Sequence, residues 1–98
     1  MKEIPPQLLA DVTLYPTAEG GRTGPTFPEW FGCSCKVLRE VTQVWDCRIL
    51  LNGTPMVPGE TRRVGMIFLS PEYALAILGL AGTFFLWEGR IIGEARIV

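Results

Sequence analysis

The sequence contains no histidine. This absence excludes Ser-His-Asp and Cys-His catalysis, histidine-ligated zinc and any histidine-based pH switch. The chain also lacks the Gly-x-x-x-x-Gly-Lys-Ser/Thr loop that holds nucleotide phosphates, and its acidic residues are scattered singly rather than paired for hydrolysis. We therefore expect a protein that is not an enzyme, needs no cofactor or metal, and binds no nucleotide.

Long apolar segments and an excess of positive charge are missing too. No uncharged apolar run reaches the length of about 18 residues that a membrane span needs, and the first residues carry no signal-peptide pattern. Three cysteines in a chain without an export signal indicate the cytoplasm, where thiols stay reduced. Nine basic and ten acidic residues give a net charge of −1, which argues against nucleic-acid binding over a broad basic surface. We expect a cytoplasmic protein with no membrane partner.

Short apolar runs separated by turn signals fill the 98 residues, a length that suits one domain. Apolar and polar residues alternate along several runs, as in half-buried strands. The pattern predicts an all-β domain over residues 8–98, preceded by an extended tail over residues 1–7. Strands are expected at residues 8–15, 30–38, 45–51, 63–69, 84–87 and 91–98, and one short helix at residues 71–80.

Local signals support the helix and the last hairpin. Ser70 occupies an N-cap position, Pro71 suits the first helical residue, and a glycine at 79 or 82 can end the helix. Gly89 suits a turn position with positive φ. Gly93, inside the final strand, predicts a bulge or a barrel corner.

Four motifs in order resemble the C-terminal domain of translation elongation factor Tu. They are Glu-Gly-Gly-Arg at 19–22, Met-Val-Pro-Gly-Glu at 56–60, Phe-Leu-Ser-Pro at 68–71, and Phe-Phe-Leu-Trp-Glu-Gly-Arg-Ile-Ile-Gly at 84–93. The resemblance covers residues 8–98, with a weak match in the middle third. It implies a closed six-stranded antiparallel β-barrel, here as a free-standing domain without the factor's GTPase domain. GTP hydrolysis is therefore not carried over.

The resemblance also implies RNA-binding residues, because in the factor this domain contacts the T-stem of aminoacyl-tRNA. Arg22 stands at the RNA-contacting arginine of the Gly-Gly-Arg loop, and Thr23 replaces the histidine that normally follows it. Glu88 and Gly89 stand at the hairpin tip that approaches the sugar-phosphate backbone. Arg22 is alternatively a loop arginine without a ligand.

Two other positions favour a protein partner over tRNA. Ser70 replaces a lysine of the family and Glu29 replaces a glutamine, which together shift the local charge by about −2 and disfavour phosphate contacts. In the factor this barrel also packs against another domain, so a free-standing copy leaves an apolar side for a protein partner or a second copy. The crowding of Phe27, Pro28 and Trp30 predicts an exposed apolar patch there. We expect a non-catalytic binding module that contacts protein first and RNA second.

Cys33, Cys35 and Cys47 form the alternative site. On adjacent strands, Cys33 and Cys35 would project from one face and meet Cys47 across the pair. Three interpretations remain open: small buried core residues, a reversible disulfide, or a zinc site that uses Asp46 as a fourth ligand. The second function hypothesis is accordingly a thiol-based redox or metal-binding protein.

Overall fold

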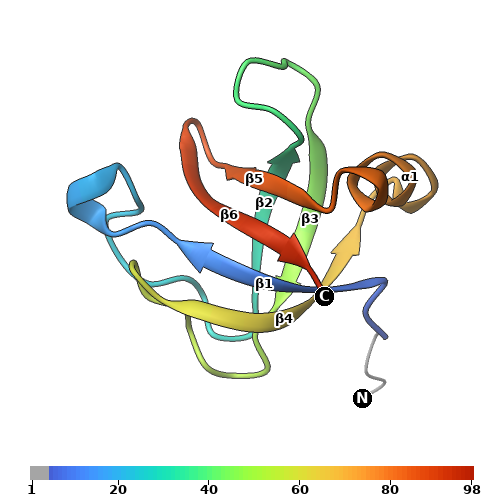
Figure 1. The fold of residues 1–98 in the computed structure, drawn as a ribbon. Helices are drawn as coiled ribbons and strands as arrows, with labels where there is room; N and C mark the ends of the chain where they lie inside the picture. The colour runs from blue at the N-terminus through green and yellow to red at the C-terminus, as the bar shows by residue number, and fades with distance from the viewer. Residues whose placement is uncertain (1–4) are drawn as a thin grey trace.

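Six antiparallel strands close into a barrel in the computed structural model, which describes residues 5–98 (Figure 1). The elements are β1 (Leu8–Leu14), the 3-10 helix η1 (Thr17–Glu19), β2 (Trp30–Lys36), β3 (Trp45–Leu50), β4 (Thr61–Phe68), α1 (Pro71–Ala81), β5 (Thr83–Trp87) and β6 (Ile91–Ile97). The strand order is β1-β4-β3-β2-β5-β6, and β6 pairs with β1 to close the ring. The six-stranded barrel with one short α-helix is thus confirmed. Every expected strand is found, with ends shifted by one or two residues.

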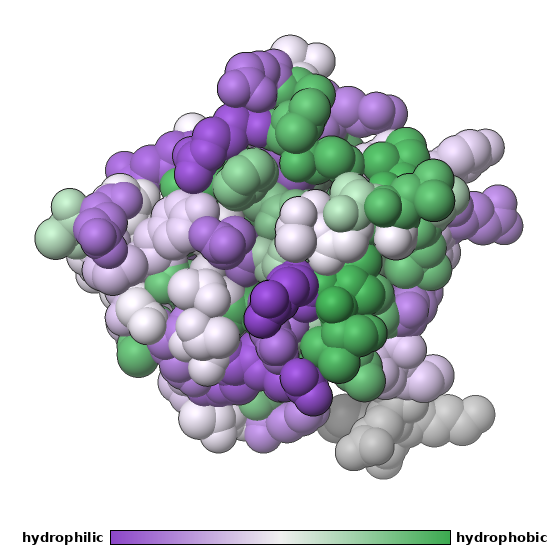
Figure 2. All heavy atoms as spheres, in the orientation of Figure 1, coloured by the Kyte–Doolittle hydropathy of each residue, from purple (hydrophilic) through white to green (hydrophobic). Residues whose placement is uncertain are grey.

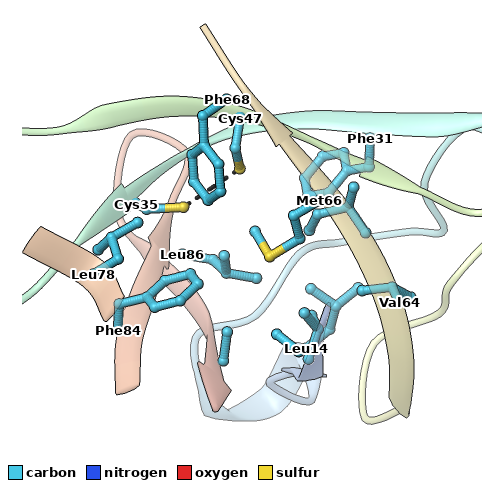
Figure 3. Close-up of a cluster of buried hydrophobic side chains, with 14 of the residues drawn as sticks. Leu14, Phe31, Cys35, Cys47, Val64, Met66, Phe68, Leu78, Phe84 and Leu86 are labelled. Carbon is cyan, nitrogen blue, oxygen red and sulfur yellow. Dashed lines mark hydrogen bonds between the residues drawn. The ribbon is translucent and has the colours of Figure 1, made fainter. Parts of the chain in front are cut away.

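The core follows from the alternation of side chains along each strand. Ala10, Val12 and Leu14 of β1 are fully buried, while the residues between them face outward. The same period directs Val64, Met66 and Phe68 of β4 into the barrel. Figure 3 shows Leu14 of β1 and Val64, Met66 and Phe68 of β4 pointing into the barrel, where they belong to one buried cluster. The interior is therefore filled by side chains, as in other small barrels.

The seam between β1 and β6 depends on a close backbone approach at Gly93. A β-carbon at this position would lie 2.4 Å from the carbonyl oxygen of Thr13. The pairing of β5 with β6 also shifts register here, because Leu86 faces Gly93 while Trp87 faces Ile91. Ile92 is therefore the extra residue of a bulge. The irregularity expected at Gly93 is therefore confirmed, although the bulged residue is its neighbour Ile92.

Helix α1 covers one open end of the barrel, which we call the helix end (Figure 1). Pro71 begins the helix and Gly82 ends it in the left-handed conformation, with φ of 77°. Ser70 occupies the N-cap position but its side chain makes no capping hydrogen bond. Ala74 and Leu78 are buried against the barrel. The opposite end, where the β5–β6 turn lies, is called the hairpin end.

The described part of the predicted tail packs on the barrel. The Gln7 amide donates a hydrogen bond of 2.9 Å to the Met66 carbonyl, and its side-chain oxygen accepts one of 2.8 Å from the Phe68 amide. Pro6 lies over Gly65, where an added β-carbon would come within 2.6 Å of the proline ring. Residues 1–4 of the predicted tail lie outside the described residues. Between residues 5 and 98, no helix is long and apolar enough to cross a membrane.

The close approach at the seam gives a stability prediction. Gly93→Ala places a methyl group against the Thr13 carbonyl, so we expect a loss of about 1–3 kcal/mol in the free energy of unfolding. The matched control is Gly79→Ala in α1, where a β-carbon meets nothing within 4 Å. Gly79→Ala should raise the free energy of unfolding by about 1 kcal/mol, because alanine is a better helix former than glycine. Urea unfolding followed by tryptophan fluorescence measures both, and equal stabilities would contradict the proposed constraint.

Candidate interaction surfaces and thiol cluster

The four residues expected to contact RNA lie together around one hollow at the hairpin end. This hollow has a volume of about 490 Å³. Its lining residues come from the loop after η1 and from the β5–β6 hairpin: Arg22, Thr23, Glu88, Gly89, Arg90 and Ile92. The fold thus brings together two segments that are far apart in the sequence.

Arg22 is held by its own chain. Its Nη1 donates to both carboxylate oxygens of Glu88, at 2.6 and 2.7 Å, and its other nitrogens reach the carbonyls of Gly24 and Pro25 at 3.3 Å. The guanidinium also lies 4.6 Å from the centre of the buried Phe31 ring. Only 20% of the Arg22 side chain is exposed. Arg22 is therefore neither a free loop arginine nor an open cationic contact.

This ion pair fills a gap in the barrel wall. Strand β2 pairs with β5 only over residues 34–36, so the first half of β2 has no partner on that side. Arg22 lies over this half, at Phe31, and Glu88 reaches it from the end of β5. Arg90 reinforces the junction, because its side chain donates to the Gly21 carbonyl at 2.8 Å. The hollow therefore lies at a junction of loop and hairpin where Glu88 balances the charge of Arg22, while Arg90 is bound only to a carbonyl.

The predicted apolar patch is exposed at the other side of β2. Phe27 is 74% exposed and Trp30 is 42% exposed, and Pro28 lies between them at the surface. The Trp30 ring lies beneath the Arg48 guanidinium, 4.5 Å from it, and leans over Gly32. From Trp30 a groove of about 1,360 Å³ extends across the outer face of the sheet. Its central row is set by strand register and runs through Trp30, Leu50, Gly65 and Leu9.

A second apolar surface lies at the helix end, and the sequence reasoning missed it. We call it the apolar band; its exposed members are Leu9, Leu69, Tyr73, Ile77, Leu80 and Val98. Figure 2 shows hydrophobic atoms gathered over α1, the C-terminal end of β6 and the start of β1. Leu80 is 92% exposed and Leu69 is 75% exposed. The sequence of α1 already indicates this surface. A helix on the surface normally has a polar face, but Glu72 is the one charged residue of α1, so apolar side chains must also cover its outer face.

The three cysteines meet inside the barrel wall, as the expected strand pairing predicted. The Cys47 sulfur lies 3.4 Å from that of Cys35 and 3.7 Å from that of Cys33 (Figure 3 draws the first contact). Hydrogen bonds from both neighbours lower the pKa of the Cys47 thiol. The contact with Cys47, together with burial, raises the pKa of the Cys33 and Cys35 thiols. The cluster therefore stabilises one thiolate, at Cys47, between two thiol donors.

The zinc interpretation gains no support from the arrangement of ligands. Within residues 5–98, no group of three or more cysteine, aspartate or glutamate side chains is placed to hold a metal ion. The Asp46 side chain instead accepts a hydrogen bond of 2.9 Å from Ser34 on the outer face.

Neither a protein-family model nor a curated protein matches the chain.

The junction at the hairpin end gives the second prediction. Glu88→Gln removes the charge that Arg22 binds and leaves a guanidinium that is mostly buried without a carboxylate. We expect a loss of about 0.5–1.5 kcal/mol in the free energy of unfolding, measured by urea titration. Glu40→Gln is the control, because Glu40 is exposed on the β2–β3 loop. If both variants unfold at the same urea concentration, the ion pair does not stabilise the barrel wall.

Proposed function

We propose that the protein is a non-catalytic interaction module that resembles the C-terminal barrel of elongation factor Tu and binds a second copy of itself through the apolar band. The observation that carries this proposal is the exposed helix stripe of Tyr73, Ile77 and Leu80. The closed six-stranded barrel is the fold that the family resemblance implies, and it supports the comparison.

The stripe has the spacing of a helix-packing surface. Tyr73, Ile77 and Leu80 stand at positions i, i+4 and i+7, so their side chains share one face of α1. An adjoining face of the helix holds Ala74 and Leu78 in the core. A helix that is apolar on both faces is stable in water only when both are covered. Leaving this face exposed keeps several large apolar side chains in contact with solvent, and covering it is favourable by about 25 cal/mol per Å².

Charge favours a second copy packed through antiparallel α1 helices. Such a two-fold arrangement places Glu72, in the first turn of one helix, near the last turn of the other. Arg96 lies there, because it pairs with Thr83 directly after the helix. Arg96 lies opposite Asp11 in the β1–β6 pairing, but that carboxylate is bound by Arg63. Among residues 5–98, Arg96 is therefore the cation without an ion pair, hydrogen bond or aromatic ring of its own. The net charge of −1 adds little repulsion between copies.

The contacts that the other cations make within the chain disfavour RNA binding. Arg22, Arg62 and Arg63 are bound to carboxylates within the chain. The remaining held cations lie over aromatic rings or on a carbonyl: Lys36, Arg39, Arg48 and Arg90. Phosphate binding draws its free energy from cations that displace counterions, and a cation already neutralised by its own chain contributes less.

Self-association is tested by sedimentation equilibrium of the wild-type chain and of Leu80→Lys. We expect the wild type to dimerise and the variant to be a monomer. Burial of a leucine contributes roughly 1.5–3 kcal/mol, and a two-fold interface contains the residue twice, so the dimer should weaken on the order of a hundredfold or more. Phe27→Lys is the matched control, because Phe27 is 74% exposed but lies outside the band. A wild-type chain that remains monomeric at millimolar concentration would overturn the proposal.

Charge reversal tests the antiparallel arrangement. Glu72→Arg and Arg96→Glu should each weaken the dimer, and the double variant should recover most of the affinity, because the pair is restored with opposite polarity. Additive losses in the double variant would show that the two residues do not meet across the interface.

The RNA hypothesis has its own measurement. Fluorescence anisotropy of labelled tRNA, aminoacylated and uncharged, is followed as protein is added at low salt. We expect no saturable change, because the Arg22 charge is balanced by Glu88. Saturable binding that prefers the aminoacylated form would instead assign the function to the hollow at the hairpin end.

A further inference from the structure

We propose that Cys33 and Cys47 form a dithiol–disulfide site that exchanges with small disulfides such as oxidised glutathione. The site lies on β2 and β3, and the inference does not depend on self-association.

Strand register selects the reacting pair. Cys33 and Cys47 are direct partners in the β2–β3 pairing, and their sulfurs are 3.7 Å apart. Directly opposed residues in antiparallel strands have Cα atoms about 4.5–5.5 Å apart. This separation falls within the range of about 4.4–6.8 Å that a disulfide spans. Rotation of the two side chains can therefore close the bond without moving the strands.

Cys35 is excluded from the bond although its sulfur is nearer. It lies 3.4 Å from the Cys47 sulfur, but its partner in the register is Trp45. Cys35 and Cys47 are thus diagonal neighbours, with Cα atoms about 7–8 Å apart. That distance exceeds disulfide geometry unless the backbone shifts. We expect Cys35 to remain a thiol.

Cys33 is the point of entry for the small disulfide. It is half-buried, whereas Cys35 and Cys47 are buried. It also lies on the half of β2 that lacks a β5 partner, beside the Arg22–Glu88 pair. The hydrogen bond with Cys47, burial and the negative charge of Glu88 raise the pKa of the Cys33 thiol, and the positive charge of Arg22 opposes this shift only in part.

The exchange proceeds in two balanced steps. The Cys33 thiol first passes its proton to the Cys47 thiolate, whose sulfur lies 3.7 Å away. The Cys33 thiolate then attacks one sulfur of oxidised glutathione, which breaks its S–S bond and releases one glutathione thiolate, and this thiolate takes the proton from Cys47. The Cys47 thiolate then attacks the Cys33 sulfur of this mixed disulfide and releases the second glutathione thiolate. The two protein sulfurs lose two electrons and one proton, which with one proton from water reduce one oxidised glutathione to two glutathione thiols. Excess reduced glutathione reverses both steps.

The test uses the full chain in its native state. It is incubated with oxidised glutathione, the remaining thiols are alkylated, and intact mass and tryptic peptides are measured. We expect alkylated thiols to fall from three to one and residues 23–36 to become disulfide-linked to residues 40–48. Both Cys33 and Cys35 lie on the first peptide, so variants must distinguish them.

Cys35→Ala should keep the linked peptides and Cys33→Ala should lose them. If a variant fails to fold, fragmentation of the wild-type linked peptides between residues 33 and 35 identifies which cysteine is bound to Cys47. Three alkylated thiols after native incubation, a glutathione adduct that persists on Cys33, or a link that survives Cys33→Ala would each overturn the proposal.

Discussion

The closure of six short strands into one ring is the constraint on which the rest of the structure depends. It gives every strand two neighbours, but it requires backbones to meet closely at the seam, where Gly93 leaves no room for a β-carbon beside Thr13. It also leaves two open ends and one incomplete ladder between β2 and β5. Segments outside the strands cover these openings: α1 at the helix end, and the loop after η1 with the β5–β6 hairpin at the hairpin end. The outer faces of these segments are the candidate binding surfaces.

The two covers have opposite consequences for binding. At the hairpin end, Arg22 is used to fill the wall, so its charge is neutralised by Glu88 and its guanidinium is partly removed from solvent. At the helix end, α1 covers the core with Ala74 and Leu78 and leaves Ile77 and Leu80 outside. Polar groups are therefore satisfied within the chain at one end, whereas apolar groups are uncovered at the other.

The strands and the helix could be predicted because their signals are local, whereas the closed six-stranded barrel was expected from the resemblance to the C-terminal domain of elongation factor Tu. Alternation gave the strands, Pro71 and Gly82 bounded the helix, and the cysteine cluster needed only that β2 and β3 be neighbours. The Arg22–Glu88 pair joins residues 66 apart in sequence, so only the closed barrel places them together. The choice of Cys33 over Cys35 as the partner of Cys47 depends on the exact register, which a shift of one residue would change. The apolar face of α1 could have been found from its single charged residue.

The interior of the barrel is filled by side chains, and this limits where the protein can bind a ligand or partner. Phe84, Met66 and Leu86 occupy the space that larger barrels leave for ligands, so recognition must use the outer surface. On that surface three arginines are paired with carboxylates and three further cations lie over aromatic rings of the same chain. What remains is apolar area of modest extent, contributed by one short helix and the ends of two strands. In the proposed dimer, a second copy brings the same apolar side chains, so the band of each chain covers that of the other.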